Sequence, residues 1–368
     1  MKAFDRRGRF LGLLCLLTAV CITVIGLVFL WSIGGAYGMP DHVKKQAIWS
    51  LVGIVLFFVV RAIDYRAVLK VADVIYVVVL GLLVLVLVAG RSAGGARRWL
   101  ALGPVSVQPS EFAKLAVVLI LAKYLSLTES FRRLRWIWVP FVIGLIPMML
   151  ILRQPDLGTA SVLLPVLGAM LYVGGVRART FLLVALLFAA ALPLLWRYMA
   201  SYQKERVIAF LSQDAPTDRQ KETILYQLMQ SKIAIGSGGL LGKGLGKGTQ
   251  NTLGFLPNRE TDFPFPVICE EWGFAGALVL FGLYFVLLLL CTVIAGRSPE
   301  PQGAYVVVGI MATLATHIIV NTGMTSGQLP VVGITLPFVS YGGSSLLVNF
   351  VGLGLVASVA SRRAGWRR

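Results

Sequence analysis

Residues 255–296 read FLPNRETDFPFPVICEEWGFAGALVLFGLYFVLLLLCTVIAG. The second half of this stretch carries no charged residue and is long enough to cross the ~30 Å hydrocarbon core of a bilayer as a helix. Asp262 precedes this uncharged run, and Glu270 and Glu271 lie between the two. Carboxylates at the start of an apolar helix are costly unless they face a polar cavity. The spacing leaves two interpretations of Asp262 open: a cap for the following helix, or a functional base.

The same apolar pattern extends over the whole chain. Of its 368 residues, 57% are hydrophobic and 14% are charged, and the mean hydropathy is +0.82, whereas soluble domains are about 25% charged. Near-continuous apolar runs of about 18–25 residues select transmembrane helices over the short alternating strands of a barrel. We therefore predict an all-α polytopic membrane protein, a single domain over residues 1–368. Its ten transmembrane helices are expected at 10–32, 46–63, 70–90, 111–127, 136–152, 157–175, 180–199, 266–295, 304–323 and 336–360.

The basic residues predict the orientation of these helices. They cluster at both ends and in alternate short connections, which the positive-inside rule assigns to the cytoplasm. Both termini are thus expected inside, and the large loop of about 200–265, between helices 7 and 8, outside the cytoplasm. The net charge of +18 is spread over short loops, so it indicates topology and not a nucleic-acid partner. The predicted cytoplasmic set is Lys2, Arg6, Arg7, Arg9, Arg61, Arg66, Lys70, Lys123, Arg132, Arg133, Arg135, Arg177, Arg179, Arg297, Arg362, Arg363, Arg367 and Arg368.

The first predicted outer segment with unusual polarity lies between spans three and four. Arg98 offers guanidinium donors that suit a phosphate. Glu111 and Lys114 are three residues apart and share a helix face, with the acid on the N-terminal side. They form either an ion pair that satisfies itself or an electrostatic clamp in an intramembrane cavity. Between spans five and six, Asp156 is predicted to cap the sixth span.

The large outer loop contains amphipathic pieces at Val207–Leu211 and Ile224–Ile235 that suit the membrane interface. Residues 236–248 are rich in glycine and include Lys243 and Lys247. Such a segment either brings backbone N–H groups and ammonium charges to a phosphate or forms a flexible loop. Its spacing does not match a Walker loop. The Gly- and Pro-rich segment 321–345, which joins spans nine and ten, can re-enter the membrane plane only against protein or water.

The cysteines and histidines are not expected to take part in catalysis or metal binding. The four cysteines have no metal-ligand spacing, and those in apolar runs behave as small hydrophobic residues. His42 is predicted in an exposed loop, and His317 within span nine is expected only to hydrogen-bond a neighbouring helix.

Six segments occur in one order along the chain, on its predicted outer side: GARRWL (95–100), QPSEFAKL (108–115), QPDLGTA (154–160), SKIAIGSGGLLGKG (231–244), TDFPFPVICEEWGF (261–274) and LPFVSYGGSS (336–345). Together they resemble the SEDS family (shape, elongation, division and sporulation) over nearly the whole chain. SKIAIGSGGLLGKG followed by GTQ looks more like the elongation branch than the division branch. Where this chain has Pro264 and Pro266 the family commonly has other residues, which leaves the start of the eighth helix open.

The resemblance implies a peptidoglycan glycosyltransferase of the bacterial cytoplasmic (inner) membrane. Such an enzyme polymerises lipid II, a disaccharide-peptide on undecaprenyl diphosphate, into a growing glycan strand on the extracytoplasmic face during cell elongation. It works among membrane lipids with a class B penicillin-binding protein, a transpeptidase. The family's essential aspartate corresponds to Asp262, and the acid and base of its fourth helix correspond to Glu111 and Lys114.

This chemistry assigns a role to each residue. Asp262 is expected to take the proton from the acceptor GlcNAc 4-hydroxyl in a single inverting displacement, whereas a retaining mechanism needs a second, nucleophilic carboxylate. Lys114 and Arg98 would stabilise the departing diphosphate, with Glu111 orienting Lys114, and Lys243 and Lys247 are further candidates for substrate binding. A divalent cation, Mg²⁺ or Mn²⁺, would suit the diphosphate, but the sequence shows no metal-ligand set.

Two other classes of function remain as alternatives. A lipid II flippase or transporter would place its polar residues near the midplane of the membrane, and here they crowd the outer side. A scaffold that only recruits the transpeptidase has no need of Asp262 or Lys114 facing a cavity.

Overall fold

The computed structural model describes residues 6–34, 41–93, 96–103, 105–127, 138–177, 179–181, 183, 186, 190, 196, 197, 201–213 and 224–362. In chain order its elements are α1 (Arg6–Ile33), α2 (Asp41–Ala62), α3 (Tyr65–Lys70), α4 (Ala72–Ala89), β1 (Arg91–Ala93), β2 (Ala96–Leu102), β3 (Val105–Val107), α5 (Pro109–Leu127), α6 (Trp138–Arg153), α7 (Leu157–Val173), α9 (Ser201–Leu211), α11 (Ile224–Ser237), α12 (Thr249–Thr252), α13 (Pro264–Gly296), α14 (Pro301–Ser326) and α15 (Gly343–Ser361).

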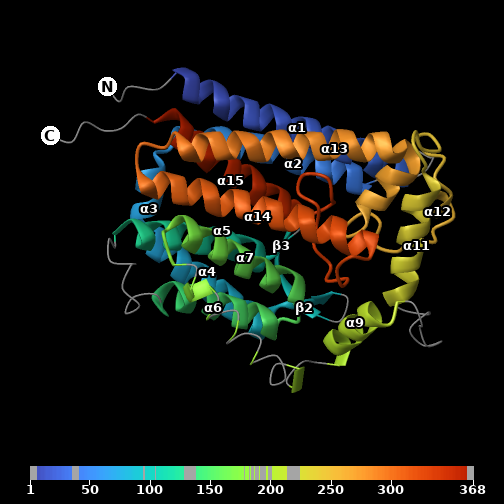
Figure 1. Ribbon diagram of the computed structural model, residues 1–368, viewed down its shortest axis with the longest axis horizontal. Helices are drawn as coiled ribbons and strands as arrows, with labels where there is room; N and C mark the ends of the chain where they lie inside the picture. Colours follow the sequence, from blue (N-terminus) through green and yellow to red (C-terminus); the bar gives the residue numbers. More distant parts are fainter. Residues whose placement is uncertain are drawn as a thin grey trace.

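Long apolar helices dominate the described structure. Six of them, α1, α2, α4, α13, α14 and α15, are long and apolar enough to cross a membrane, and α6 and α7 are shorter apolar helices. The fourth predicted span coincides with α5, whereas the seventh, 180–199, lies mostly outside the described residues. In Figure 1 the long helices lie side by side, with both chain termini at one end and α11 and α12 at the opposite end.

A small antiparallel sheet corrects the all-α prediction. Strands β1, β2 and β3 pair in that order between α4 and α5, with Leu100 opposite Val107 and Leu102 opposite Val105. Gly103, at φ +65°, makes the turn between β2 and β3, a conformation that glycine adopts without steric cost. The alternation in ARRWLAL is too short to stand out from the apolar runs on either side.

The tenth predicted span begins too early. It was expected from residue 336, but α15 begins at Gly343. Pro337 cannot donate a helical hydrogen bond, and Phe338 has a left-handed φ of +66°. Residues 328–342 therefore form an irregular segment between α14 and α15, here called the re-entrant segment, of which Ile334, Leu336 and Phe338 are buried.

The backbone of the re-entrant segment finds its partners in the surrounding helices. The Tyr284 hydroxyl donates to the Pro337 carbonyl at 2.6 Å, and Gln46 Nε2 donates to the Ser340 carbonyl at 3.0 Å. Gln46 Oε1 in turn accepts from the Gly342 N–H at 3.2 Å. Irregular backbone at membrane depth is tolerated only when protein or water satisfies it, as expected from the sequence.

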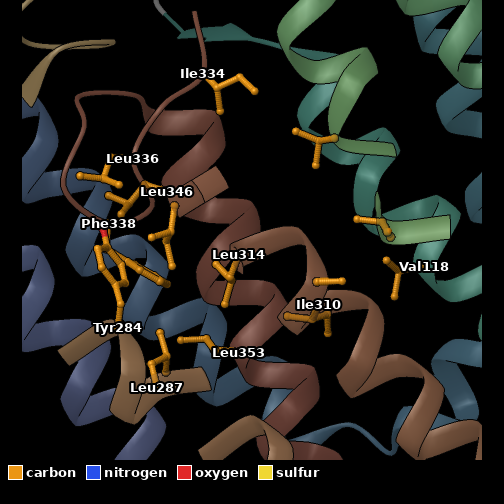
Figure 2. Close-up of a cluster of buried hydrophobic side chains, with 14 of the residues drawn as sticks. Val118, Tyr284, Leu287, Ile310, Leu314, Ile334, Leu336, Phe338, Leu346 and Leu353 are labelled. Atoms are coloured by element: carbon orange, nitrogen blue, oxygen red, sulfur yellow. The ribbon is translucent and has the colours of Figure 1, made fainter. Parts of the chain in front are cut away.

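The re-entrant segment packs into the hydrophobic core. Figure 2 shows Leu336 and Phe338 beside Tyr284 of α13 and Leu346 of α15, with Leu314 of α14 nearby. Glycines let the helices around it approach closely: a Cβ on Gly12 of α1 would lie 2.8 Å from the Ala357 side chain of α15. Such small-residue contacts are the usual way in which membrane helices pack. The core therefore holds the re-entrant segment against α13, α14 and α15.

Candidate active site

Asp262 does not cap a helix. The N-cap of α13 is Phe263, and no side chain bonds the first free N–H groups of that helix. Asp262 lies one residue earlier in a turn, where its own N–H donates to the Asn258 carbonyl at 3.0 Å. Its side chain is half-buried. The structure thus excludes the cap and leaves this carboxylate available for another role.

The Asp262 carboxylate faces the re-entrant segment and two arginines. A Cβ on Gly333 would lie 3.2 Å from Asp262 Oδ2 and 3.9 Å from Arg206 Nη1, so the three groups meet at one point. Gly333 has φ +72°, and Arg206 Nη1 donates to the Val331 carbonyl at 3.0 Å. Arg206, on α9, was not singled out from the sequence, because only the fold brings the amphipathic piece of the large loop to this position.

The electrostatic environment of Asp262 raises its pKa. Burial is the largest cause, since it disfavours the charged form. A hydrogen bond from Thr261 and the charges of Arg206 and Arg98 act in the opposite direction, and Asp156 adds to the rise. The net effect is a carboxylate that holds a proton more strongly than an exposed aspartate does.

Arg98 and Asp156 form a second polar group beside Asp262. Asp156 caps α7 as predicted, accepting from the Thr159 N–H at 3.2 Å. It also accepts from Gln108 Nε2 at 3.1 Å and from the Ser110 hydroxyl at 3.4 Å. Arg98 Nη1 lies 3.9 Å from Asp156 Oδ1, and this guanidinium also donates to the Gln154 carbonyl at 3.4 Å and to the Pro155 carbonyl. Asp156 therefore holds the strand β2, the start of α5 and the start of α7 together.

Lys114 and Glu111 form a buried ion pair on α5. Lys114 Nζ donates to both Glu111 oxygens, at 3.0 and 2.9 Å, and the two residues are only 2% and 5% exposed. His317 of α14 completes the group, with Nε2 at 2.7 Å from Lys114 Nζ. Because lysine only donates, the Nε2 atom accepts and Nδ1 carries the proton that it donates to the Thr335 carbonyl at 2.9 Å.

His317 and Asn321 connect the Lys114 group to Asp262. They lie one helical turn apart on α14 and are both buried. Asn321 Nδ2 donates to the Asp262 carbonyl at 2.9 Å and to the Ile334 carbonyl at 2.6 Å, while His317 bonds the next residue, Thr335. The prediction that His317 bonds a neighbouring helix is confirmed by its contact with Lys114 of α5, and the re-entrant segment is a second partner that was not predicted. The signal was the spacing of His and Asn, four residues apart in a helix that contains no Asp, Glu, Lys or Arg.

The glycine-rich segment packs against a break in α13. Gly273 has φ +65° and ψ −160°, outside the helical region. The N–H groups of Phe274 and Ala275, freed by this break, donate to the Gly239 and Leu240 carbonyls at 2.9 and 3.0 Å. The freed Glu270 and Glu271 carbonyls accept from the N–H groups of Lys243 and Gly244, both at 2.9 Å. The interpretation of residues 236–248 as a flexible loop is therefore wrong.

The two lysines of this segment differ in their surroundings. Lys243 Nζ lies 2.7 Å from Glu270 Oε1 and 2.8 Å from the Thr249 hydroxyl, so its charge is neutralised by a fully buried carboxylate. Lys247 is exposed. Glu271, also fully buried, accepts from the Ser32 hydroxyl at 2.5 Å and from Asn251 Nδ2 at 3.1 Å. In the described residues, no three His, Cys, Asp or Glu side chains gather in a way that would hold a metal ion.

Comparison with known proteins places this arrangement among bacterial cell-wall enzymes. The FtsW/RodA/SpoVE family model, described as "Cell cycle protein", matches residues 12–365. Peptidoglycan glycosyltransferase MrdB of Escherichia coli K12 is 40% identical over 351 residues, covering 95% of this chain and 93% of the relative. Peptidoglycan glycosyltransferase RodA of Treponema pallidum is 32% identical, covering 95% of this chain and 97% of its own.

Solved structures agree with these relatives. The crystal structure of the Thermus thermophilus rod shape determining protein RodA is 33% identical, with a TM-score of 0.70 and 97% of both chains covered. A chain from a structure on the coordination of polymerization and crosslinking by a peptidoglycan synthase complex is 33% identical, with a TM-score of 0.80. That match covers 97% of this chain and 98% of the other.

Proposed function

The chain belongs to the FtsW/RodA/SpoVE family and is a peptidoglycan glycosyltransferase, and we propose that it extends a glycan strand from lipid II during cell elongation, by a single displacement with Asp262 as the general base. The observation that carries this proposal is the Asp262 carboxylate itself. It caps no helix, its pKa is raised by burial, and it lies beside Arg206 and Arg98. A general base works best when its pKa approaches the operating pH.

The proposed step moves one proton and exchanges one bond. Asp262 accepts the proton of the GlcNAc 4-hydroxyl on the incoming lipid II. The oxygen attacks the anomeric carbon of the growing strand, and the bond to the lipid diphosphate breaks with inversion. Only one carboxylate is needed, because no covalent glycosyl intermediate forms.

The diphosphate requires positive charge as it leaves. Arg98 and Arg206 are our candidates for this role. The charges of both arginines act on Asp262, which supports the assignment. Lys114 is held by Glu111 and His317, which supports the proposal that Glu111 orients it. For Lys114 to bind the diphosphate directly, one of these two contacts must be exchanged for the substrate. Lys243 and Lys247 remain proposals for substrate binding at the rim.

A divalent cation, Mg²⁺ or Mn²⁺, remains a proposal for the leaving diphosphate. Since the described residues present no ligand cluster, such a cation would be held mainly by the substrate's own phosphate oxygens, as is common for Mg²⁺. The mechanism above routes no step through it.

We further propose ten spans with both termini cytoplasmic, the large loop outside the cytoplasm and the active site on the outer face. The partner that fits is a class B penicillin-binding protein, because one structural relative is part of a peptidoglycan synthase complex that couples polymerization and crosslinking. Helix α9, which carries Arg206, lies far from the chain termini in Figure 1, and this supports the orientation.

The deciding experiment is glycan polymerisation from purified lipid II. Asp262→Asn keeps the size of the side chain but removes the base, so we expect polymer formation to fall by at least about a hundredfold, the low end of general-base effects. Asp41→Asn is the matched control, because Asp41 is exposed at the start of α2. Wild-type activity in a folded Asp262→Asn protein would overturn the assignment. Transfer of labelled lipid II across liposomes without polymer would instead indicate a flippase.

A further inference from the structure

The imidazole of His317 has no role in the proposed reaction, although both of its nitrogens make hydrogen bonds. The residue is buried on α14, between Lys114 of α5 and Thr335 of the re-entrant segment. Its Nδ1 donates to the Thr335 carbonyl at 2.9 Å, and its Nε2 accepts from Lys114 Nζ at 2.7 Å. The ring is therefore neutral, because an Nε2 atom that faces an ammonium group carries no proton.

The two partners of Lys114 differ in charge. Glu111 is a buried anion, and among the described residues Lys114 alone bonds its carboxylate, at 2.9 and 3.0 Å. Taking Lys114 away from Glu111 would leave a buried carboxylate unpaired, which is strongly destabilising. Taking it away from His317 leaves only a neutral acceptor without its donor, a smaller penalty, and keeps the ion pair intact. A diphosphate oxygen that binds Lys114 therefore displaces His317 and not Glu111.

His317 stays in place during such an exchange. The Thr335 carbonyl holds its Nδ1 atom, and Asn321, one turn further along α14, holds the neighbouring Ile334 carbonyl at 2.6 Å. These two bonds fix the imidazole against the re-entrant segment independently of Lys114. Nε2 thus remains within reach of the Lys114 ammonium group and can accept its N–H again once the anion has gone.

We propose that His317 is a positioning residue that competes with the lipid diphosphate for Lys114. It gives up the Lys114 N–H when the diphosphate binds and accepts it again as the lipid diphosphate product leaves. Only hydrogen bonds are exchanged, and no proton is transferred. Since Lys114 is taken as a ligand of the diphosphate, this role rests on the proposed function. The competition limits how tightly the product is held at the end of each turnover.

The test is the affinity of the purified full-length protein for undecaprenyl diphosphate. This lipid is the product of the reaction and is not turned over, so the result does not depend on the role of Asp262. His317→Phe keeps an aromatic ring but offers no acceptor, so the ligand has nothing to displace from Lys114. We expect it to bind undecaprenyl diphosphate about tenfold more tightly than the wild type, the low end for a hydrogen bond to a charged group.

Two amide substitutions separate the two nitrogens of His317. The side-chain oxygen of glutamine reaches the place of Nε2 and accepts from Lys114, so His317→Gln should return the affinity towards the wild-type value. Asparagine reaches only the place of Nδ1, so His317→Asn should bind the ligand as tightly as His317→Phe. A general loss of packing would weaken binding in all three variants and would not distinguish glutamine from asparagine.

Thr316→Val is the matched control, because the Thr316 hydroxyl donates only to the Ala312 carbonyl of its own helix. It should bind undecaprenyl diphosphate like the wild type. Lys114→Met should weaken binding, and His317→Phe should have no further effect in that background. If Lys114→Met weakens binding but His317→Phe and His317→Asn do not tighten it, the role of His317 alone is overturned. Equal binding by Lys114→Met and the wild type would overturn it together with the assignment of Lys114 to the diphosphate.

Discussion

Two aspartates, Asp156 and Asp262, show how the surroundings of a carboxylate separate structure from function. Asp156 accepts hydrogen bonds from the backbone N–H and the hydroxyl of Thr159. It also accepts from the side chains of Gln108 and Ser110. Asp262 is secured through its backbone instead, by Asn258 and Asn321. Its carboxylate is thus positioned without being consumed as a helix cap, which is what a general base requires.

The raised pKa of Asp262 predicts the acid limb of the pH profile. A general base works only when deprotonated, so activity should fall as the pH drops through the pKa of Asp262. Because burial raises that pKa, the fall should be centred above the value of about 3.9 for an exposed aspartate. The profile of kcat/KM for lipid II polymerisation measures it. A limb at or below that value would show that the free enzyme's base is another group, and Asp41→Asn should leave the profile unchanged.

Asn321 is predicted to position Asp262. In Asn321→Leu the carbonyls of Asp262 and Ile334 lose a shared donor, at a cost of about 1–3 kcal/mol for each group left unpaired. We expect kcat to fall while KM stays near the wild-type value, because the substrate is still bound but the base is misplaced. Thr322→Val is the control, since the Thr322 hydroxyl donates only to carbonyls of its own helix. An unchanged kcat in a folded Asn321→Leu protein would show that Asn321 does not position Asp262.

At the scale of elements, a break at Gly273 divides α13 into two helical pieces, and the glycine-rich segment packs against the break. The break at Gly273 frees backbone groups that the glycine-rich segment then pairs. The approach is so close that a Cβ on Gly242 would lie 2.1 Å from the Glu271 carbonyl oxygen. Glycine is needed there for space as well as for its φ of +77°. Asp262 lies just before the first piece of α13, whose Glu270 and Glu271 carbonyls this segment holds.

A pair of alanine substitutions tests this junction. Gly242→Ala should lower the free energy of unfolding by about 2 kcal/mol or more, from backbone strain and the clash. Gly236→Ala should be neutral or slightly stabilising, because nothing lies within 4 Å of its Cβ position and it belongs to helix α11. Thermal unfolding of the two purified variants in one detergent measures the difference. Equal stability would mean that the segment is not packed in this way.

At the scale of the whole molecule, the two ends of the helices carry different chemistry. Helices α11 and α12, which flank the glycine-rich segment, lie at one end, while both termini lie at the other (Figure 1). The re-entrant segment joins the first end to the core, because Figure 2 places its apolar side chains against α13 and α15. The elements that carry the candidate active site therefore lie away from the chain termini.

The orientation in the membrane can be measured directly. With the termini in the cytoplasm, Lys247→Cys should react with an impermeant maleimide added outside intact cells, and Arg297→Cys should react only after the cells are opened. Both positions are exposed, so access depends on the side and not on burial. The native cysteines provide the background, which the parent chain measures. The reverse pattern would invert the predicted topology.

The sequence by itself determined the class of protein and most of the described helix positions, and it supplied the candidates for the reactive groups. It did so because apolar length and the spacing of charges are local properties. It did not reveal the sheet, the late start of α15 or the break in α13, since each depends on partners far along the chain. Only the tertiary structure brought Arg206 to Asp262, His317 to Lys114 and Asn321 to both the Asp262 turn and the re-entrant segment. Buried backbone groups must find donors wherever the fold offers them, and that requirement places these contacts.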